Sequence, residues 1–122
     1  MTQENKDLLL KDLCARLPYN VRVEYNGTTL TNIFDVLGIA HGRIMLCLPF
    51  MSKTECPLVK EVKPYLFPLS SMTKEQKEDM IKSSCGIGSD KNVFDWYNKN
   101  HFDYRGLIEK GLAIDATGLN IY

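Results

Sequence analysis

The spacing of apolar residues at the start of the chain predicts an amphipathic helix. Apolar residues recur there at the i, i+3, i+4 and i+7 spacing that lines one face of a helix: Leu10, Leu13, Cys14 and Leu17. The charged residues around them are assigned to the solvent side: Lys6, Asp7, Lys11 and Asp12. Thr2 is the predicted N-cap, and Pro18 ends the helix because its ring cannot continue it.

A change from helical spacing to alternation predicts a β-hairpin next. In "VRVEY" apolar and polar residues alternate, and the dipeptide Asn26-Gly27 follows. Asn-Gly favours the positive φ angles of a type I′ turn, so a two-residue turn is predicted there. The register that this turn implies pairs Tyr25 with Thr28 and Val23 with Leu30.

The second strand of the hairpin is predicted to continue to Val36. Ile33 and Phe34 break its alternation, so a β-bulge is predicted at these residues. The segment "GIAHG" is a predicted turn. The segment "RIMLCLPF" is a predicted strand, because it is a short apolar run between two turn signals.

The next apolar stretch, "LVKEVKPYLFPL", alternates only imperfectly. Pro64 and Pro68 bracket its most apolar part, and proline cannot donate a backbone hydrogen bond to a neighbouring strand. That part is therefore predicted to leave the sheet. Taken together, the strands predict an antiparallel meander of about three or four strands that could curl toward a small barrel.

Two helices are predicted in the C-terminal half of the chain. Thr73 and Gln76 have the spacing of a capping box, and the few apolar residues that follow predict a helix on the surface. A second helix is predicted from about Asn92 to Lys99, with Ser89 or Asp90 as its cap.

The segment "HFDYR", His101 to Arg105, places several ionisable residues between that helix and an apolar stretch. Its structural interpretation makes Asp103 the cap of a short helix that ends at Gly111, before a final short strand at "LAI". Its chemical interpretation makes His101 a general acid or base that Asp103 orients, while Arg105 binds a carboxylate or phosphate. No nucleophile lies nearby in sequence, which favours the structural interpretation. The candidate residues for binding a ligand or partner are His101, Asp103, Tyr104 and Arg105.

Length and composition predict one globular domain over residues 1–122. The apolar share of 44% and the charged share of 25% are ordinary for a folded domain. Fifteen basic residues balance fifteen acidic ones without a basic segment that would attract phosphates, which argues against a nucleic-acid partner. The N-terminal residues lack the apolar run of a signal peptide, and no stretch approaches the length of a membrane span. A cytoplasmic protein without membrane contact is therefore predicted.

The motifs of metal and cofactor sites are incomplete in this chain. Cys14, Cys47, Cys56 and Cys85 are widely spread, and we interpret them as reduced thiols that serve chiefly as small apolar residues. His41 with Cys47 and Cys56 lacks the close pairing of zinc ligands. The segment "CGIGSD" lacks the third glycine of a dinucleotide fingerprint and follows a predicted helix instead of a strand. Neither a metal site nor a cofactor is predicted.

Two phrases and one N-terminal segment of the chain carry a resemblance to a known group of sequences. They are "KPYLFPLSSMTKEQ" (Lys63 to Gln76), "NHFDYRGLIEKGLAI" (Asn100 to Ile114) and "KDLLLKDLCARLPYNV". The chain resembles a family of short uncharacterised proteins that Bacteroides-type gut bacteria and their phages or prophages encode. The resemblance implies a small intracellular protein of mobile-element origin, and it implies no reaction, cofactor or catalytic residue.

The sequence thus predicts an α+β domain with an N-terminal helix, an antiparallel meander, short C-terminal helices and a final short strand. Its predicted function is that of a small non-enzymatic binding or accessory protein with a protein partner that the sequence does not identify. Two alternatives remain: a hydrolase or transferase that uses His101 and Asp103, and a nucleic-acid accessory protein. The sequence gives no indication of the oligomeric state.

Overall fold

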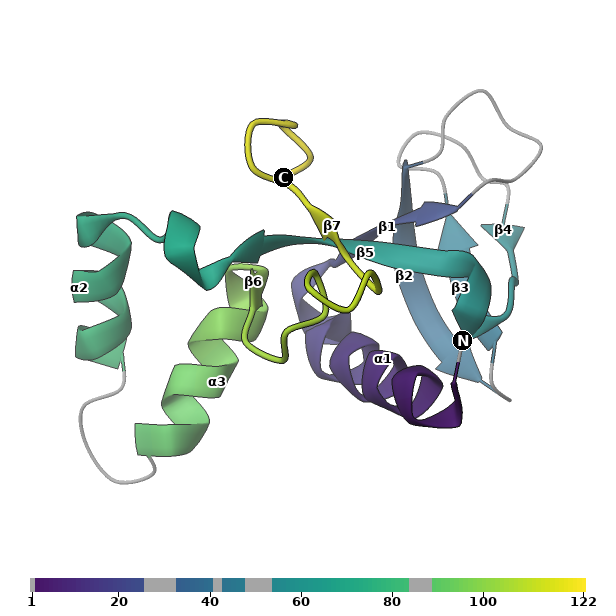
Figure 1. Ribbon diagram of the computed structural model, residues 1–122, viewed down its shortest axis with the longest axis horizontal. Coiled ribbons are helices and arrows are strands. Elements are labelled where there is room, and N and C mark those ends of the chain that lie inside the picture. The colour runs from purple at the N-terminus through teal and green to yellow at the C-terminus, as the bar shows by residue number, and fades with distance from the viewer. Residues whose placement is uncertain (1, 26–32, 41–42, 48–53, 84–88) are drawn as a thin grey trace.

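The computed structural model of the chain describes residues 2–25, 33–40, 43–47, 54–83 and 89–122 (Figure 1). Its α-helices are α1 (Gln3–Arg16), α2 (Lys74–Ser83) and α3 (Ser89–Lys99). Its strands are β1 (Arg22–Tyr25), β2 (Ile33–Ala40), β3 (Arg43–Cys47), β4 (Thr54–Glu55), β5 (Val62–Pro68), β6 (Phe102–Asp103) and β7 (Ile114–Asp115). Short 3₁₀ turns cover Leu17–Tyr19, Val59–Glu61 and Leu69–Ser71.

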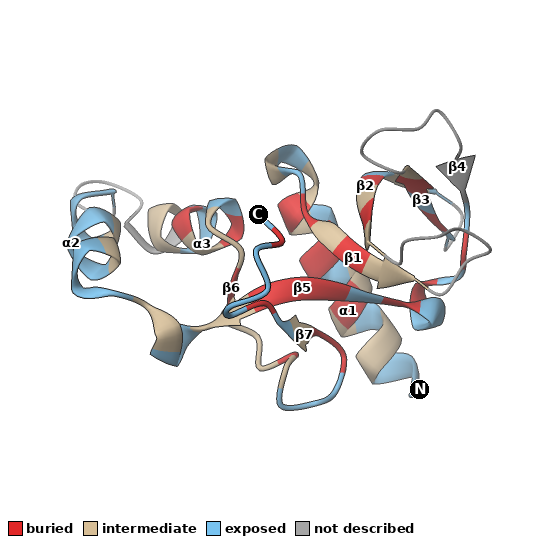
Figure 2. Ribbon diagram, turned by 90° about the horizontal axis from the view of Figure 1, so that it is seen from above, coloured by how far each residue is buried: buried red, intermediate tan, exposed pale blue. Residues whose placement is uncertain are grey.

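The strands form a mixed sheet in the order β4-β3-β2-β1-β5-β6, and β7 also pairs with β5. Antiparallel pairs join β1 to β2 and β5, and β3 to β2 and β4, whereas β6 and β7 pair with β5 in parallel. Helices α2 and α3 form a lobe at one end of the molecule, away from β2 and β3 (Figures 1 and 2). The predicted α+β class is confirmed, with its N-terminal helix, antiparallel strands, C-terminal helices and final short strand.

The main core lies between α1 and one face of the sheet. Its buried residues are Leu9, Leu13, Val21, Val23, Phe34, Val36, Ile44, Leu46, Val59, Val62, Leu66, Leu107, Leu112 and Ala113. A smaller cluster of Tyr65, Ala116 and Ile121 is formed by β5 and the C-terminal residues. Successive residues of a strand point to opposite faces, so Leu66 joins the main core while Tyr65 joins the smaller cluster on the other face.

The buried face of α1 is displaced by one residue from the predicted face. The residues that are buried still follow the i, i+3, i+4, i+7 spacing: Leu9, Asp12, Leu13 and Arg16. Cys14, predicted to be buried, is exposed, and Asp12, predicted to face solvent, is buried. The prediction was wrong because it counted only apolar residues, whereas Asp12 and Arg16 form an ion pair inside the molecule. The predicted cap is confirmed, since the Asn5 N–H donates to Thr2 Oγ1 at 3.1 Å.

The antiparallel pairing of β1 with β2 is confirmed, but the predicted register is wrong. Val23 lies opposite Phe34 and not opposite Leu30, which lies outside the described residues together with Asn26-Gly27 and Thr28. Val23 and Phe34 are both buried in the main core, and matching two core residues across the strands sets this register.

The strand β2 also differs from its prediction in its bulge and its end. The pairing with β3 shifts between Val36 and Gly38, so the bulge lies at Leu37 and not at Ile33 and Phe34. The strand runs on to Ala40 through the residues that were predicted to turn. The rest of that predicted turn, residues 41 and 42, lies outside the described residues.

The prediction that the proline-bracketed stretch leaves the sheet is wrong, because β5 pairs with β1, β6 and β7. The Leu66 carbonyl accepts from the Ala116 N–H at 2.8 Å, on the β7 side. Backbone groups two residues apart point to the same edge of a strand, so Pro64 also turns its nitrogen toward that edge. The pairing with β7 begins only at Tyr65, so the missing N–H of Pro64 interrupts no ladder bond there.

The capping box before α2 is confirmed. The Gln76 N–H donates to Thr73 Oγ1 at 3.1 Å, and the Thr73 N–H donates to Gln76 Oε1 at 2.8 Å. Every residue of α2 is described, and none of them is buried, as predicted. Helix α3 begins at Ser89, so Ser89 and Asp90 belong to the helix, and their prediction as caps is wrong.

The helix predicted after Asp103 is absent from the described structure, where residues 107–111 form turns. Gly106, inside the predicted helix, has a φ of +74°, a left-handed value that a continuous right-handed helix does not contain. Gly111 has a φ of +73°, which is the conformation expected of a glycine that ends a helical turn, as predicted. The Leu112 N–H donates to the Leu107 carbonyl at 2.9 Å, so one tight turn replaces the helix. In the part of the chain that is described, no helix is both long and apolar enough to span a bilayer.

Candidate functional site

The backbone of His101 joins α3 to the sheet. His101 has a left-handed φ of 63°, and its N–H donates to the Asn98 carbonyl at 3.3 Å at the end of α3. Its carbonyl accepts from the Phe67 N–H at 2.8 Å, which starts the parallel pairing of β6 with β5. A histidine tolerates the left-handed region better than most residues with a side chain. His101 can therefore occupy the position where the backbone turns from α3 into β6.

The imidazole of His101 is held under the last residue of the chain. Its ring stacks on the Tyr122 ring with a centroid distance of 3.7 Å and an interplanar angle of 7°. Its Nδ1 is buried and has no hydrogen-bond partner among the described residues. Burial, together with the positive charges of Arg16 and Arg22, lowers the pKa of His101 to about 4. His101 is therefore neutral at pH 7, with its pKa far below that pH.

The carboxylate of Asp103 is fully used by backbone amides. Asp103 Oδ1 accepts from the Leu107 N–H at 3.0 Å and from the Arg105 N–H at 3.3 Å. Asp103 Oδ2 accepts from the Ile108 N–H at 2.9 Å. Asp103 thus caps a turn, as the structural interpretation of the sequence required, although the turn does not continue into a helix. Both oxygens are engaged, so Asp103 does not orient His101.

Arg105 and Tyr104 belong to an internal network that reaches α1. Arg105 Nε donates to Asp12 Oδ1 at 3.1 Å, and another guanidinium nitrogen of Arg105 donates to the Tyr104 hydroxyl at 2.8 Å. The Tyr104 hydroxyl donates to Asn98 Oδ1 at 3.0 Å, and the Arg105 guanidinium lies 4.7 Å from the centroid of the Tyr104 ring. These contacts engage two of the three guanidinium nitrogens of Arg105 inside the protein.

The centre of this network is an ion pair that sequence reasoning missed. Arg16 Nε lies 2.8 Å from Asp12 Oδ2, and both side chains are fully buried. Arg16 also donates to the carbonyls of Phe102 and Tyr97, so helix α1 is tied to the segment after α3. The i, i+4 spacing of Asp12 and Arg16 was a signal that could have found the pair, because side chains four apart meet on a helix.

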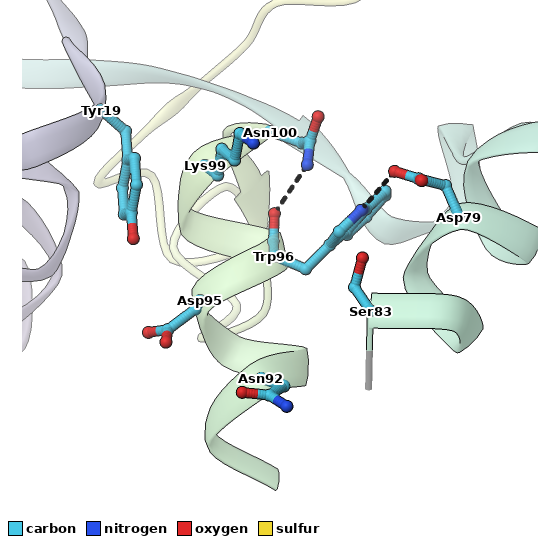
Figure 3. A pocket seen from close by; sticks show the side chains of 8 residues that line it. All are labelled: Tyr19, Asp79, Ser83, Asn92, Asp95, Trp96, Lys99 and Asn100. Atoms are coloured by element: carbon cyan, nitrogen blue, oxygen red, sulfur yellow. Dashed lines mark hydrogen bonds between the residues drawn. The ribbon is translucent and has the colours of Figure 1, made fainter. Parts of the chain in front are cut away.

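A polar pocket of about 380 Å³ lies at the α2–α3 lobe (Figure 3). Its lining residues come from α2, α3 and their surroundings: Tyr19, Asp79, Ser83, Asn92, Asp95, Trp96, Lys99 and Asn100. Trp96 Nε1 donates to Asp79 Oδ2 at 2.8 Å and so links the two helices, while Asn100 Nδ2 donates to the Trp96 carbonyl at 2.9 Å. Asp95 is exposed and makes no hydrogen bond with any residue that the structure describes.

Among the pockets formed by the described residues, none is lined by all four candidate residues. Asp103 and Tyr104 line a pocket of about 310 Å³ with Pro68, Leu69, Ser70, Gly106, Ile108 and Glu109, but His101 and Arg105 are not among its described lining residues. The pocket of the α2–α3 lobe is lined by none of the candidates, and no local pattern in the sequence predicts it, because it depends on the contact between two helices.

The described residues include three of the four cysteines. Cys14 and Cys56 are exposed and Cys47 is partly buried, so the interpretation of Cys14 and Cys56 as packing residues is wrong. Cys85 lies outside the described residues. In the described ranges, no three histidine, cysteine, aspartate or glutamate side chains are close enough together to hold a metal ion.

Comparison with known proteins gives no relative for this chain. No protein-family model matches it, and neither a curated protein nor a solved structure does. The class that the structure defines is therefore a small α+β protein with a mixed sheet and a two-helix lobe.

Proposed function

We propose that this chain is a small non-enzymatic binding or accessory protein that acts in the cytoplasm through a protein partner, and that it derives from a phage or prophage. The observation that carries the proposal is the internal use of the candidate residues. Asp103 caps a turn, Arg105 pairs with Asp12, and His101 stacks beneath Tyr122. An acid-base catalyst needs a pKa near the working pH, whereas the pKa of His101 is about 4 and its Nδ1 is buried.

The α2–α3 lobe supports the binding part of the proposal. Helix α2 buries none of its described residues, and Ile81 on α2 and Phe94 on α3 are exposed large apolar side chains. The pocket of the lobe carries the polar side chains of Asn92 and Asp95, which make no hydrogen bond with any residue that the structure describes. Ile81 and Phe94 are not among its lining residues and lie on other sides of their helices, so the lobe offers apolar groups and polar groups on different faces. Protein interfaces commonly combine a few exposed apolar residues with polar groups at their rim. We propose this lobe as the surface that contacts the partner.

The test is a capture experiment with charge-reversed variants of the full chain. The tagged protein is incubated with a lysate of cells that encode it, and the bound proteins are identified by mass spectrometry. Asp95→Lys alters the pocket, and Glu78→Lys makes the same change of charge on exposed α2 outside the pocket lining. We expect one protein to be retained by the wild type and by Glu78→Lys, and to be lost at least about tenfold with Asp95→Lys, because a charge at an interface is unfavourable beside a like charge.

Two outcomes of the capture experiment would contradict the proposal. Equal retention by both variants would remove the lobe as the contact surface. Release of the captured material by nuclease, or by moderate salt as expected of phosphate contacts, would favour a nucleic-acid accessory protein instead.

A further inference from the structure

The residues after β7 form a strap, Ala116–Tyr122, that covers one face of β5. Ala116 and Ile121 of the strap are buried with Tyr65 of β5. The chain crosses β5 between β7 and its end, so Tyr122 reaches the side on which β1 lies (Figure 2). A guanidinium nitrogen of Arg22 on β1 donates to the Ile121 carbonyl, which fixes the end of the strap.

The hydroxyl of Tyr122 fills a gap between two backbone ladders. The pairing of β1 with β5 stops at Val23 and Pro64, and the pairing of β6 with β5 starts at Phe67. In the gap, the Arg22 N–H donates to the Tyr122 hydroxyl at 3.0 Å, and this hydroxyl donates to the Tyr65 carbonyl at 2.7 Å. One side-chain group thus replaces a bond between strands, and it holds only while the strap is in place.

His101 lies directly under this contact in surroundings that disfavour its charged form. The Tyr122 ring covers one face of the imidazole, and the buried Nδ1 has no partner among the described residues. The charged groups that act on it are Arg16 of α1 and Arg22 of β1. The nearby carboxylates are engaged elsewhere: Asp12 pairs with Arg16, Asp35 with Arg22, and Asp103 accepts from amides.

We propose that His101 and Tyr122 form an acid-sensitive latch, in which protonation of His101 releases the strap while the main core stays folded. An imidazolium at this place would carry a buried N–H without an acceptor and would be repelled by two guanidinium groups. When Tyr122 moves away, water can reach the imidazolium ring. Water then accepts a hydrogen bond from the N–H and screens the repulsion between the ring and the two guanidinium groups. The latch is independent of the proposed function and of the identity of any partner.

The size of the effect follows from the two states of the ring. In the closed state the pKa of His101 is about 4, and in the state with the strap open the pKa would approach its ordinary value of 6.5. The open state then takes up a proton between these two values, and the closed state does not. The opening equilibrium constant should therefore rise about 20-fold between pH 7 and pH 5.

Amide hydrogen exchange measures this opening on the full chain. The Arg22 amide donates to the Tyr122 hydroxyl, so its protection reports the latch, whereas the Ile44 amide donates to the Pro57 carbonyl at 3.0 Å and reports the sheet. Protection factors are measured at pH 7 and pH 5 and corrected for intrinsic exchange rates. His101→Asn is the test variant because asparagine tolerates a left-handed φ, and His41→Asn controls for the other histidine of the chain.

We expect the protection factor of Arg22 to lie well below that of Ile44 at both pH values, and to fall about 20-fold between pH 7 and pH 5 in the wild type and in His41→Asn. In His101→Asn we expect the protection of Arg22 to be the same at both pH values, whatever its absolute size. Three results would overturn the latch: unchanged protection of Arg22 in the wild type, equal protection of Arg22 and Ile44 at both pH values, or the same pH dependence in His101→Asn.

Discussion

At the scale of single residues, the carboxylate of Asp103 has a structural role, because it binds the backbone amides of the loop that follows it. It accepts from three backbone amides within the five residues that follow it, and it is almost fully buried. Those amides lie at the start of a turn, where backbone N–H groups have no partner within the turn itself. The carboxylate therefore satisfies donors that would otherwise be buried without partners.

Removal of this carboxylate should destabilise the protein measurably. We expect Asp103→Ala to lower the free energy of unfolding by about 2 kcal/mol, since it leaves several buried amides unpaired. Urea denaturation measures the change. Asp115→Ala is the matched control, because Asp115 is exposed and accepts from the Thr117 amide at 2.9 Å, so a clearly smaller loss is expected. Equal losses in the two variants would contradict the role assigned to Asp103.

Tyr122 offers a second residue-scale test that separates its hydroxyl from its ring. Tyr122→Phe keeps the stack on His101 but removes the partner of the Arg22 N–H and the Tyr65 carbonyl. We expect a loss of about 1 to 2 kcal/mol in unfolding free energy by urea denaturation. Tyr19→Phe, in the α2–α3 lobe pocket, is the control and should cost little. A neutral Tyr122→Phe would mean that water replaces the hydroxyl in the gap.

At the scale of elements, α1 is held by a charged pair as well as by its leucines. Asp12 and Arg16 are as buried as Leu9 and Leu13, and Arg105 reaches Asp12 from the segment after β6. Two guanidinium groups thus share one carboxylate inside the molecule. An ion pair in that position is costly to break, because each partner left behind remains charged and desolvated.

The loss of Asp12 should therefore be among the most damaging changes in the chain. We expect Asp12→Ala to lower the free energy of unfolding by about 3 to 5 kcal/mol, because it strands Arg16 and Arg105 without their carboxylate. Asp7→Ala on the exposed side of α1 is the control and should change stability little. Thermal and urea unfolding measure the stability of both variants. Similar stabilities for the two would contradict the role assigned to the buried network.

The elements themselves were largely predictable from local sequence, and their pairings were not. The cap at Thr2, the capping box at Thr73 and Gln76, and the antiparallel start of the sheet depend on neighbouring residues. The register of β1 and β2 depends instead on which residues the core accepts, and Asn26-Gly27 gave a misleading local signal for it. The place of β5 at the centre of three pairings depends on distant partners that local patterns do not contain.

The candidate site was predictable in its residues but not in its use. The sequence singled out His101, Asp103 and Arg105, and it assigned Asp103 a capping role that the structure confirms. It missed the partners of the other two residues, because Asp12 and Tyr122 lie far from them along the chain. The burial of Asp12 was also missed, because a charged residue in an amphipathic helix is normally assigned to the solvent side.

At the scale of the whole molecule, burial of His101 makes stability depend on pH. The unfolded chain binds a proton at His101 below its ordinary pKa of 6.5, whereas the folded protein does so only below about 4. The unfolded state therefore holds more protons between these values, and stability is lost as the pH falls from 6.5 toward 4. After allowance for partial exposure of the ring, the loss should be about 2 kcal/mol.

Unfolding free energies measured between pH 7 and pH 4 check this dependence. We expect the wild type to lose stability across the window and His101→Asn to show a smaller loss, because asparagine does not titrate. His41→Asn should behave like the wild type. A pH dependence that is identical in all three proteins would assign the acid loss to other groups.

The charged segment His101 to Arg105, on this account, holds the fold together through internal contacts. A titration of the His101 ring by NMR in the full-length protein tests that claim most directly. An internal residue covered by Tyr122 and flanked by Arg16 and Arg22 should titrate with a pKa of about 4. A pKa of His101 near 6.5 or above would show a ring open to solvent or poised for proton transfer, and it would contradict the account.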